Sequence, residues 1–143
     1  MARSESSVEV PRSAAEVFAF LADGTNNSKW RSGVQGIKHL RGVGLGAEYE
    51  QQIVGPGGRT MQANYRVVAW EEPTRLEFEV TAGPARPRGA FTIVATSPAS
   101  CRVTFEITLQ VQGVMKMVQG MIEQQVRAEA AAIQNLPRAM REA

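Results

Sequence analysis

The chain contains little cysteine and little histidine, with one residue of each among 143. A single cysteine, Cys101, cannot form an intrachain disulfide, and it mildly favours a reducing compartment. With His39 as its only histidine, the chain also lacks the ligand set of a zinc site of the His/Cys type. We therefore expect no metal and no other cofactor.

Long hydrophobic runs are absent as well. No stretch approaches the roughly eighteen consecutive apolar residues that a membrane-spanning helix requires. The segment Met1–Glu5 leads directly into polar residues, without the apolar core of a signal peptide. These features predict a cytoplasmic protein with no integral membrane association.

The chain also has little excess of charge of either sign. Sixteen Lys and Arg residues face 14 Asp and Glu residues, which leaves a net charge of +2, and the cations are scattered along the chain. Nucleic acid is therefore not an expected partner. The length and composition are those of one globular domain over residues 1–143.

The N-terminal part predicts one strand followed by two short helices. Ser7–Val10 has the pattern of the end of a strand, which Pro11 stops. Ser13 and Glu16 form a capping box that opens a helix, and Asp23-Gly24 ends it. A second helix is expected over residues 26–31, with Thr25 as its cap and Trp30 on its inner side.

Residues 34–111 predict about six further strands separated by turns rich in glycine and proline. Leu76, Phe78 and Val80 alternate with polar residues, and residues 103–111 do the same, as in an antiparallel sheet covered on one face. The glycines at 42, 44 and 46 could suggest a dinucleotide-binding loop, but a strand and not a helix follows them. We interpret them as a turn.

A long helix is predicted from Val114 to Pro137, because apolar residues recur there at three- and four-residue spacing. The residues of this stripe are Val114, Met117, Val118, Met121, Ile122, Val126, Ala130, Ile133 and Leu136. Long strands followed by one long helix predict an α+β fold, in which a curved antiparallel sheet of about seven strands wraps around the helix. Such a grip can leave a hollow between the two layers.

The order of these motifs resembles the START-like helix-grip superfamily, and within it the polyketide cyclase/dehydrase branch. The resemblance covers nearly the whole chain and rests on residues 8–18, Trp30, residues 44–49, residues 65–76 and residues 133–136. It implies a deep hydrophobic cavity between the sheet and the last helix. Relatives include lipid and steroid carriers, plant hormone receptors, aromatase/cyclases and chaperone ATPase activators. Pro137 replaces the usual lysine of the family, so the last helical turn is expected to end or kink early.

Three polar residues on the predicted strands, Tyr49, Gln51 and Tyr65, are the best candidates to orient a ligand, because apolar residues surround them in each pattern. Both tyrosines could instead be core residues, and Met117 and Met121 could belong to the buried stripe. The full set of candidate ligand-binding residues is Trp30, Tyr49, Gln51, Met61, Tyr65, Phe78, Phe91, Phe105, Met117 and Met121.

No catalytic constellation emerges from the sequence. The glutamates of the well-patterned strands fall on the wet face, Asp23 is best explained as a helix-end residue and His39 as a surface or rim residue, and Cys101 has no activating partner nearby. If the protein is an enzyme of the cyclase or dehydratase type, Tyr65 is the first candidate acid.

Three functions therefore stay open. The favoured one is binding of a small hydrophobic molecule, such as a lipid, a polyketide or an aromatic metabolite. The alternatives are a polyketide cyclase or dehydratase that uses the same cavity, and a protein-interaction module with a collapsed cavity. A homodimer is compatible with each.

Overall fold

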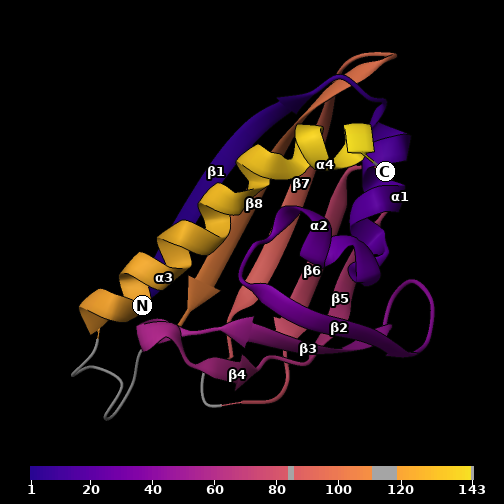
Figure 1. Cartoon of the computed structure of the whole chain (residues 1–143). Helices are drawn as coiled ribbons and strands as arrows, with labels where there is room; N and C mark the ends of the chain where they lie inside the picture. Colours follow the sequence, from indigo (N-terminus) through magenta and orange to yellow (C-terminus); the bar gives the residue numbers. More distant parts are fainter. Residues whose placement is uncertain (84–85, 111–118, 143) are drawn as a thin grey trace.

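The computed structural model describes residues 1–83, 86–110 and 119–142, and its main feature is one curled antiparallel sheet (Figure 1). Seven strands are hydrogen-bonded in the order β1-β8-β7-β6-β5-β3-β2, and the short β4 pairs with β3. Their bounds are β1 Ala2–Val10, β2 Val34–Arg41, β3 Glu48–Val54, β4 Thr60–Gln62, β5 Tyr65–Glu71, β6 Arg75–Val80, β7 Arg88–Ser97 and β8 Ser100–Leu109.

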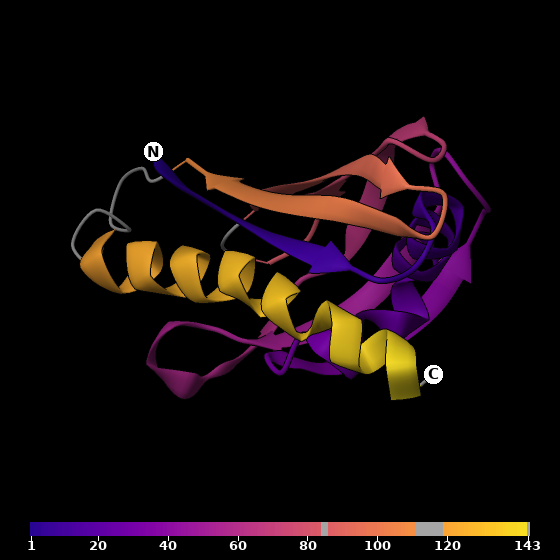
Figure 2. The ribbon, with the colours of Figure 1, turned by 90° about the horizontal axis from the view of Figure 1, so that it is seen from above.

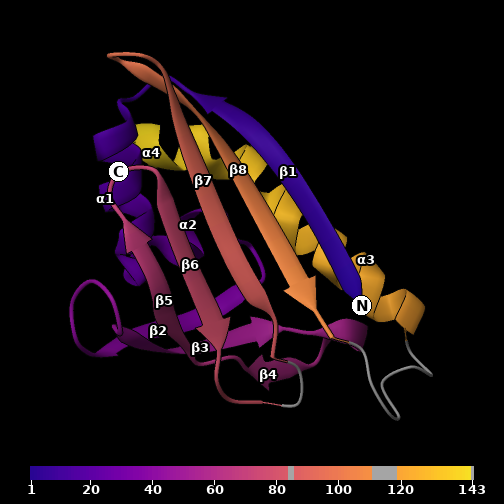
Figure 3. The same cartoon turned by 180° about the vertical axis from the view of Figure 1, so that it is seen from behind.

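The sheet curls around the C-terminal helix, which confirms the predicted α+β helix-grip fold. Seen from above, the helix has β1, β8 and β7 on one side and β2 and β3 on the other (Figure 2). From behind, the long strands β7, β8 and β1 run along the helix while β2 and β3 cross below them (Figure 3). The dry faces of the strands meet the helix, so Leu76, Phe78 and Val80 are buried as their alternation predicts.

The first strand ends at Val10 as predicted and begins at Ala2, well before the residues whose pattern indicated its end. Its polar start, with Arg, Ser and Glu at positions 3–6, gives no apolar pattern, yet Ala2 already pairs with Leu109 in an antiparallel ladder with β8. Backbone hydrogen bonds, which do not depend on side-chain polarity, hold this edge strand.

The helices after β1 follow the prediction in number but not in detail. Helix α1 (Ala14–Ala22) has the expected capping box, and hydrogen bonds from the Ser13 side chain and backbone lower the pKa of the Glu16 carboxyl. A 3-10 turn, η1 (Gly24–Asn26), then leads into α2 (Asn27–Trp30). The cap of this segment is Asp23, which accepts a hydrogen bond from the Thr25 backbone at 3.1 Å, and not Thr25 as predicted.

The C-terminal helix is segmented into α3 (Gln119–Ala131), η4 (Ala132–Asn135) and α4 (Leu136–Glu142). The helix continues past Pro137, so the expected end there is wrong: the proline lies in the first turn of α4, where its missing N–H has no helical partner to lose. The α-helix is nevertheless interrupted just before the proline, by the 3-10 segment η4. The Pro137 ring would clash with the carbonyl four residues earlier in a continuous α-helix, which accounts for the 3-10 segment before it. A further 3-10 turn, η2 (Pro56–Gly58), contacts α3.

The predicted apolar stripe is confirmed for Ile122, Val126, Ala130, Ile133 and Leu136, which are all buried. Met121 differs, since 45% of its surface is exposed. The neighbouring Ile122 is buried in the core, so Met121 lies at the margin of the buried face of α3. Val111, Val114, Met117 and Val118 lie outside the described residues.

Gly89 on β7 leaves the space that the Phe78 ring occupies on β6, since a Cβ at Gly89 would overlap that ring. Replacing Gly89 with alanine is expected to lower the free energy of unfolding by about 1–3 kcal/mol, because the ring must leave its well-packed position. Urea denaturation measures this change.

Gly120→Ala in helix α3 is the control, because a Cβ at Gly120 meets nothing within 4 Å. It should leave stability unchanged or raise it by up to about 1 kcal/mol. Equal effects of the two substitutions would contradict this account.

Candidate functional site

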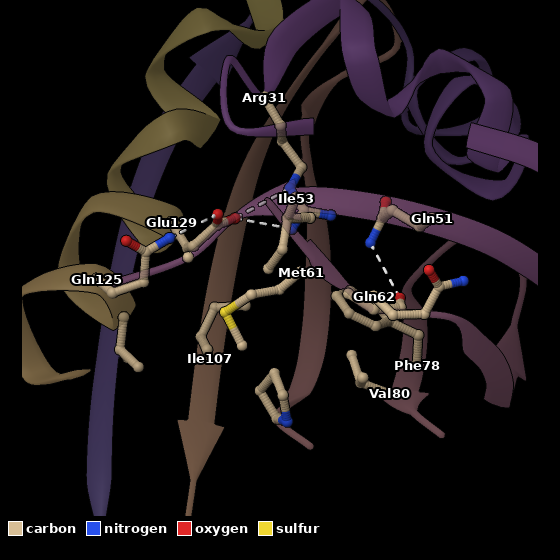
Figure 4. A pocket seen from close by; sticks show the side chains of 14 residues that line it. Arg31, Gln51, Ile53, Met61, Gln62, Phe78, Val80, Ile107, Gln125 and Glu129 are labelled. Atoms are coloured by element: carbon tan, nitrogen blue, oxygen red, sulfur yellow. Dashed lines mark hydrogen bonds and ion pairs between the residues drawn. The ribbon is translucent and has the colours of Figure 1, made fainter. Parts of the chain in front are cut away.

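A small cavity lies between the sheet and helix α3, with a volume of about 70 Å³. Its wall is mostly apolar, and the apolar side chains come from four strands and the helix. They are Ile53 on β3, Met61 on β4, Phe78 and Val80 on β6, Ile107 on β8 and Val126 on α3 (Figure 4). A mostly apolar lining with a few polar groups is the composition expected of a small-molecule site.

A buried ion pair forms the polar side of this cavity. Arg31, at the C-terminal end of α2, is 5% exposed, and its guanidinium donates from Nε and Nη2 to Oε2 of Glu129 on α3 at 3.2 and 2.7 Å. Both side chains line the cavity, and they are the only charged residues that do so in the described chain. Removing either partner would leave the other charge buried without compensation, which is strongly destabilising.

Gln125 connects helix α3 to strand β3. Its side-chain amide donates to the Val54 carbonyl of β3 at 2.9 Å and lies 3.4 Å from Oε1 of Glu129. Arg31, Gln125 and Glu129 also line an open groove of about 310 Å³ on the other side. The three side chains therefore form a wall between the cavity and that groove.

A second polar cluster is buried beside the cavity. The Asn27 side-chain amide donates to Oε1 of Gln51 and to the Tyr65 hydroxyl, each at 3.1 Å. The Gln51 amide in turn donates to the Ala63 carbonyl at 3.4 Å. Burial raises the pKa of the Tyr65 hydroxyl above its ordinary value, so this tyrosine stays neutral throughout the physiological range.

The chain as a whole matches a known family. Residues 1–137 match the sequence model of the family described as polyketide cyclase / dehydrase and lipid transport. The chain belongs to this family. No curated protein is similar enough in sequence to match it.

Solved structures of this fold agree with the family assignment. A START superfamily protein from Mycobacterium smegmatis is 16% identical, with a TM-score of 0.77 and 100% of both chains covered. The Zhui aromatase/cyclase from Streptomyces sp. R1128 is 15% identical, with a TM-score of 0.77 and coverage of 98% of this chain and 94% of the other. A protein from Thermus thermophilus is 14% identical, with a TM-score of 0.75 and 99% of both chains covered. At these identities the likeness concerns the fold.

In this member of the family, the structure divides the predicted ligand-binding residues into three groups. Gln51, Met61 and Phe78 line the cavity. Another group, Trp30, Tyr49, Tyr65, Phe91 and Phe105, is buried in the core and does not line it. Met121 is largely exposed, and Met117 lies outside the described residues.

The aromatic residues of the second group pack against other aromatic rings. The rings of Phe91 and Phe105 stack with centroids 4.4 Å apart, and Trp30, 1% exposed, meets both edge-on. Trp30 is therefore a core residue and not a residue of a cavity rim. Tyr49 stacks on Tyr65 at 5.1 Å, as expected if both tyrosines are core residues.

His39 and Cys101, which were considered for catalysis, do not line the cavity. His39 is exposed, with Nε2 2.6 Å from the Gly42 carbonyl, and Cys101 is fully buried, which raises the pKa of its thiol. Within the parts of the chain that the structure describes, no three His, Cys, Asp or Glu side chains form a group that could hold a metal ion. None of the helices described there is long and apolar enough to cross a membrane.

Arg31 and Glu129, the two charged residues of the cavity, were not predicted from the sequence. In the sequence, each has the appearance of a surface residue, since Arg31 follows a short helix and Glu129 lies beside the apolar stripe. One signal was available. Glu129 falls between Val126 and Ile133 at helical spacing, at the margin of the buried face.

The hydrogen bonds of Asn27 predict unequal effects for two substitutions in the polar cluster. Tyr65→Phe removes one acceptor and leaves the bond from Asn27 to Gln51, so it should cost about 1 kcal/mol of unfolding free energy. Asn27→Ala leaves the Gln51 oxygen and the Tyr65 hydroxyl buried without their donor, which should cost about 2–3 kcal/mol. Urea denaturation of both variants measures the difference. If Tyr65→Phe lowered the unfolding free energy as much as Asn27→Ala or more, Asn27 would not be the shared donor of this cluster.

Proposed function

We propose that the protein reversibly binds a small hydrophobic ligand in the cavity between the sheet and helix α3. The observation that carries this proposal is the apolar wall that Ile53, Met61, Phe78, Val80 and Ile107 form around an unfilled space. Apolar walls supply affinity, and a few polar groups fix orientation. Membership of a family that includes lipid transport supports the same function.

The cavity volume requires some adjustment on binding. At about 70 Å³ it is smaller than the roughly 150 Å³ cavity that accommodates benzene in an engineered protein. Met61 projects into the space and is half-buried, and methionine is unbranched and flexible. We infer that a ligand displaces the Met61 side chain.

The cyclase alternative has less support from the residues of the site. Tyr65 is the candidate acid, but its hydroxyl lies in the Asn27 cluster and does not line the cavity. The two ionisable groups on the described cavity wall are bound to each other. The cavity as described therefore suits binding better than proton transfer.

Met61→Trp tests the binding function directly. The larger indole would occupy the cavity, so the affinity for an apolar fluorescent probe should fall by about tenfold or more. Val94→Trp is the matched control, because Val94 is 56% exposed on β7, and its affinity should equal that of the wild type. Fluorescence titration gives the affinities, circular dichroism confirms folding, and native mass spectrometry of protein from its host identifies any co-purified ligand.

Two results would contradict the proposal. Folded wild-type protein that carries no ligand and binds no apolar probe would favour the interaction module. Equal probe binding by Met61→Trp and the wild type would place the binding site elsewhere.

A further inference from the structure

We propose that Glu129 sets the charge selectivity of the cavity, so that it takes neutral hydrophobic molecules with an acceptor oxygen, such as a ketone, over carboxylates of the same shape. This inference rests on the proposed binding function. It assigns to the Arg31–Glu129 pair a role in specificity in addition to its part in holding α3 against α2.

The guanidinium of Arg31 has a donor left over for a ligand. Arginine carries five N–H groups, and the bonds to Glu129 use Nε and Nη2. The third nitrogen, Nη1, points away from Glu129 toward the side of the cavity where Gln51 lies (Figure 4). No hydrogen bond joins Nη1 to any residue in the described ranges. A ligand oxygen at this point would complete the hydrogen bonding of a nearly buried guanidinium.

Each of the other side-chain amides of the wall already donates a hydrogen bond. The amide of Gln51 donates to Ala63, and its oxygen accepts from Asn27. The Gln125 amide donates to Val54, and the Gln62 amide donates to Asn64. Arg31 Nη1 is the donor nitrogen of the described wall that has no hydrogen bond, and the complementary group on a ligand is an acceptor oxygen.

Glu129 decides which acceptor the site prefers. Its carboxylate already balances the positive charge of Arg31, so the net charge of the described cavity wall is zero. A ligand carboxylate would add an uncompensated negative charge next to Glu129 in a largely apolar space, which is costly. A ketone oxygen would accept the same hydrogen bond without that cost.

The test compares three ligands of the same shape by displacement of an apolar fluorescent probe at neutral pH. The ligands are octanoate, methyl heptyl ketone and nonane, which differ only in the head group. Wild-type protein should bind the ketone at least about tenfold more tightly than octanoate. In Glu129→Gln, which keeps the shape but removes the negative charge, octanoate should gain about tenfold or more relative to the ketone.

Glu123→Gln is the matched control, because this substitution removes one negative charge from the same helix. Glu123 accepts a hydrogen bond from Gln119 and does not line the cavity. The substitution should leave the ratio of the two affinities unchanged. The double variant Arg31→Met/Glu129→Gln avoids leaving one charge unpaired, and in it the ketone should lose its advantage over nonane.

The outcomes separate the two proposals. If folded wild-type protein binds none of the three ligands, the binding function itself fails. If it binds them but prefers octanoate, or if Glu129→Gln changes the affinity for both oxygenated ligands equally, the selectivity role is wrong. Equal changes would mean that the ion pair acts only as a wall of the cavity.

Discussion

The C-terminal helix is attached to the two sides of the curled sheet by different forces. On the side of β1 and β8, Ile122, Val126 and Ala130 are buried in ordinary apolar packing. Toward β3 and α2 the helix makes polar contacts, since the Gln125 amide donates to the Val54 carbonyl and Glu129 accepts from Arg31. The side chains of Arg31, Gln125 and Glu129 line the unfilled space on this side of the helix.

The position of Arg31 depends in turn on its neighbour in the chain. Trp30 is fixed between Phe91 and Phe105, and its carbonyl accepts a hydrogen bond from the Asn135 side chain at 3.1 Å. This contact ties the end of α2 to η4, so the residue that follows Trp30 is delivered to the inner side of α3. The packing of Trp30 thus determines the position of the Arg31 charge, although an unpaired charge would be unfavourable in an apolar core.

Alternation and helical spacing predicted the main elements because burial of one face is a local property of the sequence. Phe78 and Ile107 follow that rule, and so do Val126 and Ala130 on the helix. The same rule cannot separate a core residue from a cavity residue, since both are apolar and turned inward. Tyr65 and Phe105 therefore had the same pattern as Phe78, although only Phe78 lines the space.

The charged residues of the site were beyond this kind of reasoning for a different reason. Arg31 and Glu129 are 98 residues apart, and nothing local to either indicates that the fold brings them together. Desolvation of a charge becomes acceptable only when its partner is already in place, which is a property of the tertiary structure. Met121 shows the converse, because it belongs to the predicted stripe and is 45% exposed, while the neighbouring Ile122 is buried.

The pairing of the first strand with the last has a consequence for how the chain acquires its structure. Ala2 lies opposite Leu109, and Val10 opposite Cys101, so the contacts that complete this edge of the sheet join the most distant parts of the sheet in sequence. Proteins dominated by such non-local pairings fold slowly compared with helical bundles. During synthesis, β1 has to wait until β8 has left the ribosome. Its polar sequence, with serines at positions 4, 6 and 7, presents few apolar side chains for aggregation while the strand is unpaired.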